Sequence, residues 1–346
     1  MKNQTEEKEW YVLFPQPVEE KAIQPLKKRG IDVVLAPDAK IESVAPLMKR
    51  ARAVVLRTGI MMTEELLGQS EDLWMISRTG AGVDNVDIKA ATKRGILVTS
   101  SIGVNTDSVV EHSLALILSL YKQIPLLDSE VRKGNFGIRY KYLPKDLNGK
   151  CLGVVGFGRI GSRVAELCHK LFNMRIIAYD PLLSSDIKEK VNGWVSIVSL
   201  GDLCSASDVV SIHVPLNEKT RGLIGRRHLE LMKPDAIIIN TSRGGIIDEG
   251  ALIDALQKGK ISGAGLDVFE KEPPDKNNPL LSMDNVILTP HSAALTKECV
   301  LKMALSATRR IIDLFDGFIP DNVANHEVLN QPKWRHLRRK REDDPR

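Results

Sequence analysis

The first hundred residues alternate between short apolar runs and longer segments with the spacing of amphipathic helices. The apolar runs have the length of buried strands and lie at 11–14, 32–36, 53–56, 74–77 and 96–99. Because strands that alternate with helices build a parallel sheet covered on both faces, this part of the chain predicts an α/β domain.

A second alternation of the same kind begins at residue 151. We expect its strands at 151–155, 175–179, 209–214, 236–240, 263–268 and 286–288, and a final helix at 295–315. Between the two sets, residues 108–121 are apolar around almost the whole circumference of a helix, so this helix should be buried on most faces. The order of elements predicts an α/β fold class with two doubly wound parallel-sheet domains.

Composition agrees with this organisation and narrows the class of protein. The length of 346 residues suggests two domains, and 43% hydrophobic with 27% charged residues is typical of a soluble globular protein. No apolar run approaches the roughly 18 residues that a membrane span needs, and the first nine residues are too polar for a signal peptide. Four scattered cysteines lack the spacing of metal ligands, so we expect buried thiols, a cytoplasmic location and no metal.

The net charge of +5 comes mostly from the C-terminal end of the chain. Residues 333–346 hold seven Lys or Arg and three Asp or Glu, so the remainder is close to neutral. The basic stretch 334–341 could contact nucleic acid or an acidic partner, but a frayed, solvated terminus accounts for it as well. We expect a disordered tail at 331–346 and no nucleic-acid partner.

A motif with the spacing G-x-G-x-x-G follows the expected strand at 151–155. The turn needs Gly156, a pyrophosphate can approach the backbone at Gly158, and Gly161 lets the next helix pack on the strand. Such glycines also occur in purely structural turns. However, Asp180 ends the following strand, about 20 residues on, where an acidic residue accepts hydrogen bonds from an adenosine ribose. Since this carboxylate would repel a 2′-phosphate, the pattern predicts a dinucleotide site that favours NAD over NADP.

Three short segments downstream carry an arginine, a glutamate and a histidine in that order. They read Asn-Thr-Ser-Arg243-Gly-Gly, Asp267-Val-Phe-Glu-Lys-Glu272-Pro-Pro and Thr-Pro-His291-Ser. Together with the glycine motif they resemble the D-2-hydroxyacid dehydrogenase family, which includes phosphoglycerate, glycerate and D-lactate dehydrogenases. The resemblance covers residues 10–325.

The resemblance implies a division of the chain and an assembly. It implies a Rossmann NAD-binding domain at 108–293 and a discontinuous, flavodoxin-like substrate domain at 1–107 and 294–330. It also implies a homodimer. With about 55 residues after His291, an added regulatory domain is not expected.

Within this resemblance, three side chains are the candidate catalytic residues. His291 can give and take a proton near neutral pH, and Glu272 can fix its tautomer and stabilise its charged form. Arg243 offers a fork of donors to the carboxylate and carbonyl of a 2-keto acid. Each has a plainer interpretation alone, as a structural histidine, an exposed glutamate or a surface arginine, but the common order and flanking residues favour one site.

The resemblance extends to further binding residues. Backbone N–H groups of Gly80, Ala81 and Gly82 are expected on the substrate carboxylate, and Asn105 near the nicotinamide and substrate; a plain turn and a helix cap are the alternatives. His213 is expected on the adenine and ribose side, or else is a histidine at a strand end. The full cofactor set that it implies is Gly156, Gly158, Arg159, Ile160, Gly161, Asp180, His213, Pro215, Thr220, Thr241, Arg243, Asp267 and His291.

The substrate is less constrained than the reaction. Arg57 and Arg78 end expected strands, and arginines at matching places hold the substrate phosphate in the phosphoglycerate branch of the family; Arg139 roughly matches a third basic residue there. We therefore expect an NAD-dependent oxidoreductase for 3-phosphoglycerate, or for glycerate, hydroxypyruvate or glyoxylate. The alternative is a corepressor-like interaction protein that retains the dehydrogenase fold and NAD.

Overall fold

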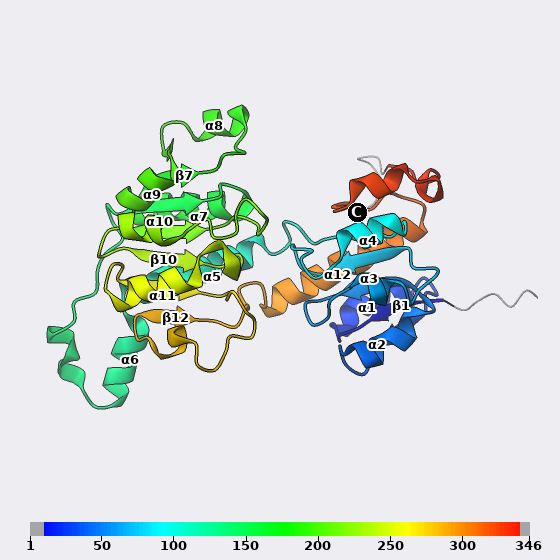
Figure 1. Cartoon of the computed structure of the whole chain (residues 1–346), viewed down its shortest axis with the longest axis horizontal. Coiled ribbons are helices and arrows are strands. Elements are labelled where there is room, and N and C mark those ends of the chain that lie inside the picture. Colours follow the sequence, from blue (N-terminus) through cyan, green and yellow to red (C-terminus); the bar gives the residue numbers. More distant parts are fainter. Residues whose placement is uncertain (1–9, 340–346) are drawn as a thin grey trace, which may run out of the picture. The chain divides into compact units, whose positions relative to one another are not determined.

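A computed structural model of the chain describes residues 10–339, which form two compact units. Of the described residues, 10–105 and 295–339 belong to unit 1, and Thr106–Ala294 form unit 2. Unit 1 is therefore assembled from both ends of the chain, whereas unit 2 is one continuous segment. Figure 1 shows the late helix α12 (Lys297–Phe315, orange) among the blue elements of unit 1.

Unit 1 contains a five-stranded sheet in the order β2-β1-β3-β4-β5, with parallel pairing throughout. This is the strand order of flavodoxin-like folds. Its strands are β1 (Tyr11–Phe14), β2 (Val33–Leu35), β3 (Ala51–Leu56), β4 (Met75–Arg78) and β5 (Leu97–Thr99). The other helices of this unit are α1 (Glu20–Lys27), α2 (Ile41–Met48), α3 (Glu64–Leu67), α4 (Ile88–Lys93), and the 3-10 turns η4 (His326–Asn330) and η5 (Pro332–Trp334).

Side chains of successive residues on these strands pack on opposite faces of the sheet. Leu13, Val54 and Ile76 pack with α2, α3 and α4 on one face. Val12 and Val55 pack with α1 and α12 on the other. Because both faces are covered, the strands read as continuous apolar runs, which is why they could be recognised in the sequence.

The last described residues belong to the body of unit 1. Trp334 is buried, and its indole N–H donates to Gly95 O at 2.9 Å. Its ring meets Trp74 edge to face, with the centroids 5.8 Å apart. The expectation of a disordered tail from residue 331 is therefore wrong for residues 331–339, because the charge of this segment masked an aromatic anchor. Residues 340–346 of that tail lie outside the described residues.

Unit 2 contains a seven-stranded parallel sheet in the order β12-β11-β10-β9-β6-β7-β8. Its strands are β6 (Cys151–Val155), β7 (Arg175–Tyr179), β8 (Val195–Ile197), β9 (Val209–Ile212), β10 (Ile237–Asn240), β11 (Gly263–Leu266) and β12 (Val286–Leu288). Its helices are α5 (Thr106–Tyr121), α6 (Ile124–Arg132), α7 (Arg159–Phe172), α8 (Ser185–Val191), α9 (Leu200–Ala206), α10 (Arg226–Leu231), α11 (Glu249–Gln257), and the 3-10 turns η1 (Phe136–Tyr140), η2 (Gly244–Ile246) and η3 (Pro279–Ser282).

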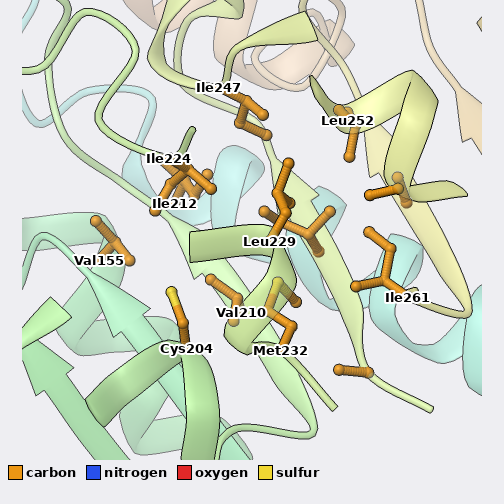
Figure 2. Close-up of a cluster of buried hydrophobic side chains, with 14 of the residues drawn as sticks. Val155, Cys204, Val210, Ile212, Ile224, Leu229, Met232, Ile247, Leu252 and Ile261 are labelled. Atoms are coloured by element: carbon orange, nitrogen blue, oxygen red, sulfur yellow. The ribbon is translucent and has the colours of Figure 1, made fainter. Parts of the chain in front are cut away.

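Two apolar layers cover the faces of this sheet. In one, α5 and α7 pack against strand residues such as Val154 and Ile239. In the other, α9, α10 and α11 pack against Val155, Val210 and Ile212; Figure 2 shows these side chains converging with Leu229 and Leu252. The predicted α/β fold class, with two doubly wound parallel sheets, is confirmed. The strand β8 was missed, because it is a three-residue edge strand with only Val195 buried.

One part of unit 2 projects from this body. Helix α6 has no buried residue, and Figure 1 shows it extending from the rest of the unit. The segment 124–143, called the arm below, also carries exposed apolar side chains at Phe136, Tyr140 and Leu143. None of the helices within the described residues is long and apolar enough to span a membrane.

Candidate active site

The glycine motif forms the turn from β6 into α7. Gly156 has φ 92°, and a Cβ there would lie 2.7 Å from His213 O. A Cβ at Gly161 would lie 2.1 Å from Gly156 O, so both positions exclude a side chain. At Gly158, by contrast, a Cβ would have nothing within 4 Å. The turn thus presents open backbone at the N-terminus of α7, the surroundings that a pyrophosphate requires.

Asp180 fixes this turn from the end of the neighbouring strand. Its Oδ2 accepts from Phe157 N and its Oδ1 from Leu182 N, each at 2.9 Å. A carboxylate oxygen can accept more than one hydrogen bond, so both oxygens keep capacity for a ribose hydroxyl. The carboxylate is therefore held beside the glycine turn in the place that a dinucleotide needs.

The loop after β9 adjoins the same turn. Burial lowers the pKa of His213 to about 4, so its ring is neutral at physiological pH, and Nε2 is 2.8 Å from Ser211 Oγ. Thr220 donates its hydroxyl to Pro215 O at 2.6 Å and closes the loop. Both β6 and β9 lie at the point where the strand order reverses, which is where ligands bind in open α/β sheets.

The arginine loop follows β10 and is braced by side chains within it. Asn240 donates its amide to Arg243 O at 2.8 Å and accepts from Ser242 N at 3.0 Å. Thr241 is buried, with its hydroxyl 2.9 Å from Ser113 Oγ on α5. A Cβ on Gly244 would lie 1.8 Å from Phe269 O, so only glycine lets this loop approach the segment that carries Glu272.

His291 and Glu272 meet at the carboxyl end of the same sheet. His291 Nδ1 lies 2.7 Å from Glu272 Oε2, and Glu272 Oε1 accepts from Phe269 N at 3.1 Å. Partial burial alone would raise the pKa of Glu272. The hydrogen bonds from His291 and from the Phe269 amide outweigh it and hold that pKa below its usual value, so the glutamate is ionised at neutral pH.

The histidine backbone adopts an uncommon conformation. His291 has φ 51°, in the left-handed region. Its N–H donates to Asp267 O at 2.7 Å, and Asp267 itself is almost fully buried at the end of β11. Strand ends of unit 2 therefore hold the glycine turn, Asp180, the Arg243 loop and the His291–Glu272 pair along one edge of one sheet.

The candidate residues of unit 1 are placed differently from each other. Arg57 follows β3, and its guanidinium donates to Pro17 O at 2.8 Å beyond β1; these two strands flank the point where the order of this sheet reverses. Arg78 ends β4 and is buried, and a Cβ added at Gly80 would lie 3.1 Å from its Nη1. Ala81 and Gly82 continue this partly exposed turn, and Asn105 directly precedes α5.

Arg139 lies on the arm of unit 2 and not at a strand end. Its guanidinium stacks on Phe136 and Tyr140, 4.6 and 4.7 Å from the ring centroids, and Nη2 donates to the Tyr140 hydroxyl at 2.6 Å. The structure thus brings together the unit 2 candidates apart from Arg139. The described residues contain no group of three or more His, Cys, Asp or Glu arranged to hold a metal ion.

Two residues beside this site were not among those predicted from the sequence. His112 and Thr289 were noted only as parts of an apolar helix and of a short motif, yet His112 Nε2 lies 2.9 Å from Thr289 Oγ1. A histidine inside an otherwise apolar helix was the available signal.

This glycine turn, with Asp180 beyond it on a doubly wound sheet, defines the class of dinucleotide-binding Rossmann domains. Residues 114–293 match the model of the D-isomer specific 2-hydroxyacid dehydrogenase, NAD binding domain. The chain belongs to the D-isomer specific 2-hydroxyacid dehydrogenase family. The family resemblance and the expectation of NAD as cofactor are thereby confirmed.

Relatives within the family carry several activities. The chain is 40% identical over 91% of its length to a D-3-phosphoglycerate dehydrogenase of Archaeoglobus fulgidus, of which it spans 59%. It is 38% identical over 92% of its length to a glyoxylate reductase of Thermococcus litoralis, of which it spans 97%. A solved D-lactate dehydrogenase from Aquifex aeolicus, complexed with NAD and lactic acid, superposes with a TM-score of 0.79 at 32% identity, covering 92% of this chain and 97% of that one.

Proposed function

We propose that this protein is an NAD-dependent oxidoreductase that interconverts a D-2-hydroxyacid and its 2-keto acid. The observation that carries the proposal is the 2.7 Å pair of His291 and an ionised Glu272, on the same sheet edge as the Arg243 loop and the glycine turn. A carboxylate-oriented histidine beside a guanidinium is the equipment for moving a proton on a carbonyl oxygen.

The roles of the chain's own residues follow from this geometry. Since Glu272 occupies Nδ1, the proton that reaches the substrate oxygen during reduction leaves from Nε2 of His291. The negative Glu272 stabilises the ring while it is charged. Arg243 orients the carboxylate and carbonyl of the keto acid. The bound nicotinamide supplies or accepts the hydride.

The cofactor contacts are proposed on the same basis. The backbone at Gly158, Arg159 and Ile160 faces the pyrophosphate at the start of α7, and Asp180 accepts hydrogen bonds from the adenosine ribose. A fixed negative charge at Asp180 disfavours a 2′-phosphate, so NAD is preferred over NADP.

For the substrate, we propose an acid with a second anionic group, and 3-phosphoglycerate as the first candidate. Arg57 supports this because it is only partly buried and lies at the strand-order reversal of its sheet, where ligands bind. Arg78 is buried, so Arg57 is the more accessible of the two guanidinium groups. The backbone of Gly80–Gly82 is proposed to bind the substrate carboxylate.

The arm supports a homodimer as the working assembly. The side chains of Phe136, Tyr140 and Leu143 lie on one short segment and are each more than 60% exposed. A cluster of large apolar side chains is rarely left in contact with water, so we propose that a second copy of the chain covers it. Light scattering of the wild type and of Leu143→Asp tests this: a dimer that becomes a monomer supports it. The burial of all four free cysteines agrees with a proposed cytoplasmic location.

A panel of keto acids with NADH tests the activity. Phosphohydroxypyruvate, hydroxypyruvate, glyoxylate and pyruvate are compared by the loss of nicotinamide absorbance, with NADPH as the control cofactor. The proposal expects NADH oxidation with at least one of them and the highest kcat/KM for phosphohydroxypyruvate. If NADH binds tightly and none is reduced, the corepressor-like alternative takes its place.

A further inference from the structure

Behind His291 lies a chain of three polar side chains that reaches from β11 to α5. Asp267 Oδ1 accepts the Thr289 hydroxyl at 2.6 Å and Ser292 N at 2.8 Å, and its Oδ2 accepts Ala293 N at 2.9 Å. Thr289 Oγ1 is in turn 2.9 Å from His112 Nε2. The Asp267 carboxylate thus binds the polypeptide on both sides of His291.

The directions of these hydrogen bonds follow from what each group can do. A carboxylate accepts only, so the single hydrogen of the Thr289 hydroxyl points to Asp267. The Thr289 oxygen must then accept from His112, which places the ring hydrogen of His112 on Nε2. His112 therefore completes the network as a donor, and its side chain is 78% shielded from solvent.

The reason for such a network is the backbone of His291. A non-glycine residue in the left-handed region persists when its surroundings hold it there. The backbone bond from His291 N to Asp267 O fixes only one point of the loop. The hydrogen bonds from the Asp267 carboxylate hold Thr289, two residues before His291, and Ser292 and Ala293, the two residues after it. Together they set the direction of the imidazole ring.

We propose that Thr289 and His112 are positioning residues for the dehydrogenase reaction. They act through Asp267 to hold His291 in hydrogen-bond register with Glu272, and this inference rests on the proposed function. A misplacement of a reacting group by about 1 Å can reduce turnover roughly 100-fold, so loss of the network should lower kcat more than it weakens NADH binding.

Matched pairs of variants separate hydrogen bonding from shape. Thr289→Val keeps the side-chain volume and loses the hydroxyl, whereas Thr289→Ser keeps the hydroxyl. His112→Leu loses the donor, whereas His112→Gln retains an N–H near the position of Nε2. In Thr289→Val and His112→Leu we expect kcat to fall by about 10- to 100-fold, with the Kd for NADH within about twofold of wild type. In Thr289→Ser and His112→Gln we expect most of the activity to be retained.

Proton NMR tests the same inference without measuring turnover, because it observes the hydrogen bond between His291 and Glu272 directly. The hydrogen shared by His291 and Glu272 should give a far-downfield resonance that His291→Ala removes. We expect this resonance to broaden or shift in Thr289→Val and His112→Leu and to persist in Thr289→Ser. If the wild type reduces no keto acid but the resonances follow this pattern, the proposed function fails and the positioning inference stands.

The inference is overturned by either of two results. One is an unchanged resonance together with kcat within about twofold of wild type in Thr289→Val and His112→Leu. The other is equal loss of activity in the Ser and Val variants, with lowered Tm in both, which assigns Thr289 a role in stability only. Should Thr289→Val not fold, the His112 pair decides the question in the same way.

Discussion

In unit 2, Asn240 and Asp267 clamp the loops at the ends of β10 and β11, whereas in unit 1 Asn85 and Ser101 clamp the loops after β3 and β4. Asn85 donates its amide to Arg57 O and Ile60 O at 2.8 and 2.9 Å. Ser101 donates its hydroxyl to Arg78 O at 3.1 Å, and its backbone N–H to Gly80 O at 2.9 Å. Both sheets thus use small buried polar side chains to stiffen the ends of their strands.

The groups that these clamps present are different. In unit 2 they present reactive side chains, since His291 and Glu272 remain nearly 40% exposed. In unit 1 they present a turn of backbone around Gly80, with Arg78 buried against it. Under the proposed function, unit 2 carries the proton donor and the cofactor contacts, and unit 1 carries the groups proposed to recognise the substrate. Substitutions in unit 2 should therefore change kcat or cofactor affinity, and substitutions in unit 1 should change KM.

The largest expected effect is that of His291→Ala. Loss of the proton donor should lower kcat by roughly 10²- to 10⁴-fold, because general acid–base groups contribute rate accelerations of that order. The Kd for NADH, measured by its fluorescence, should stay close to that of the wild type. Turnover at the wild-type level in this variant would remove the proposed mechanism.

A smaller effect, confined to KM, is expected from unit 1. Arg57→Ala should raise KM for phosphohydroxypyruvate by about 10- to 100-fold, the worth of a hydrogen bond to a charged group, with little change for glyoxylate. The division of roles between the units is wrong if Arg57→Ala lowers kcat instead, or if KM rises equally for phosphohydroxypyruvate and glyoxylate. Arg57→Lys is the matched control, since it keeps the charge and loses the fork of donors.

Substitutions of Asp180 test the proposed cofactor contacts of unit 2. Asp180→Ala should raise the Kd for NADH about 10-fold and reduce the preference over NADPH, because the ribose loses an acceptor and the repulsion disappears. Asp180→Asn keeps one acceptor oxygen and removes the charge, so it should lose less NADH affinity than Asp180→Ala while it also improves NADPH binding. A wild-type protein that prefers NADPH would contradict the role given to this carboxylate.

The smallest effect is a displacement along the pH axis. Reduction needs the charged form of His291, and the ionised Glu272 favours that form. In Glu272→Gln this negative charge beside the ring is lost, so the falling limb of the kcat profile should move to lower pH. A profile that does not move, with the chemical step limiting, would separate Glu272 from the histidine.

The sequence predicted the fold where burial leaves a plain pattern. Strands covered on both faces, such as β6 and β10, stood out as apolar runs. Edge strand β8 did not, since two of its three residues are exposed. The segment around Trp334 was misjudged because nearby charges concealed one anchoring ring.

The site residues also divide into those that a local sequence pattern shows and those that it does not. Arg243, Glu272 and His291 were proposed from short local segments, and the structure places them on one sheet edge. A histidine in an apolar helix marks His112 as unusual, but its partner Thr289 lies 177 positions away, so a local pattern does not show which residue it pairs with. The burial of Arg78 and the stacking of Arg139 likewise depend on side-chain packing that strand ends alone do not specify.

The discontinuity of unit 1 has a consequence for synthesis on the ribosome. Ser77 on β4 donates to Ala307 O, Asn325 accepts from Val98 N on β5, and Trp334 donates to Gly95 O, each across more than 220 residues. Unit 2 is continuous and can fold as soon as it has emerged, because domains fold as units during translation. The strands of unit 1 must wait through the whole of unit 2 for α12, so β4 and β5 are the surfaces that chaperones should cover in the nascent chain.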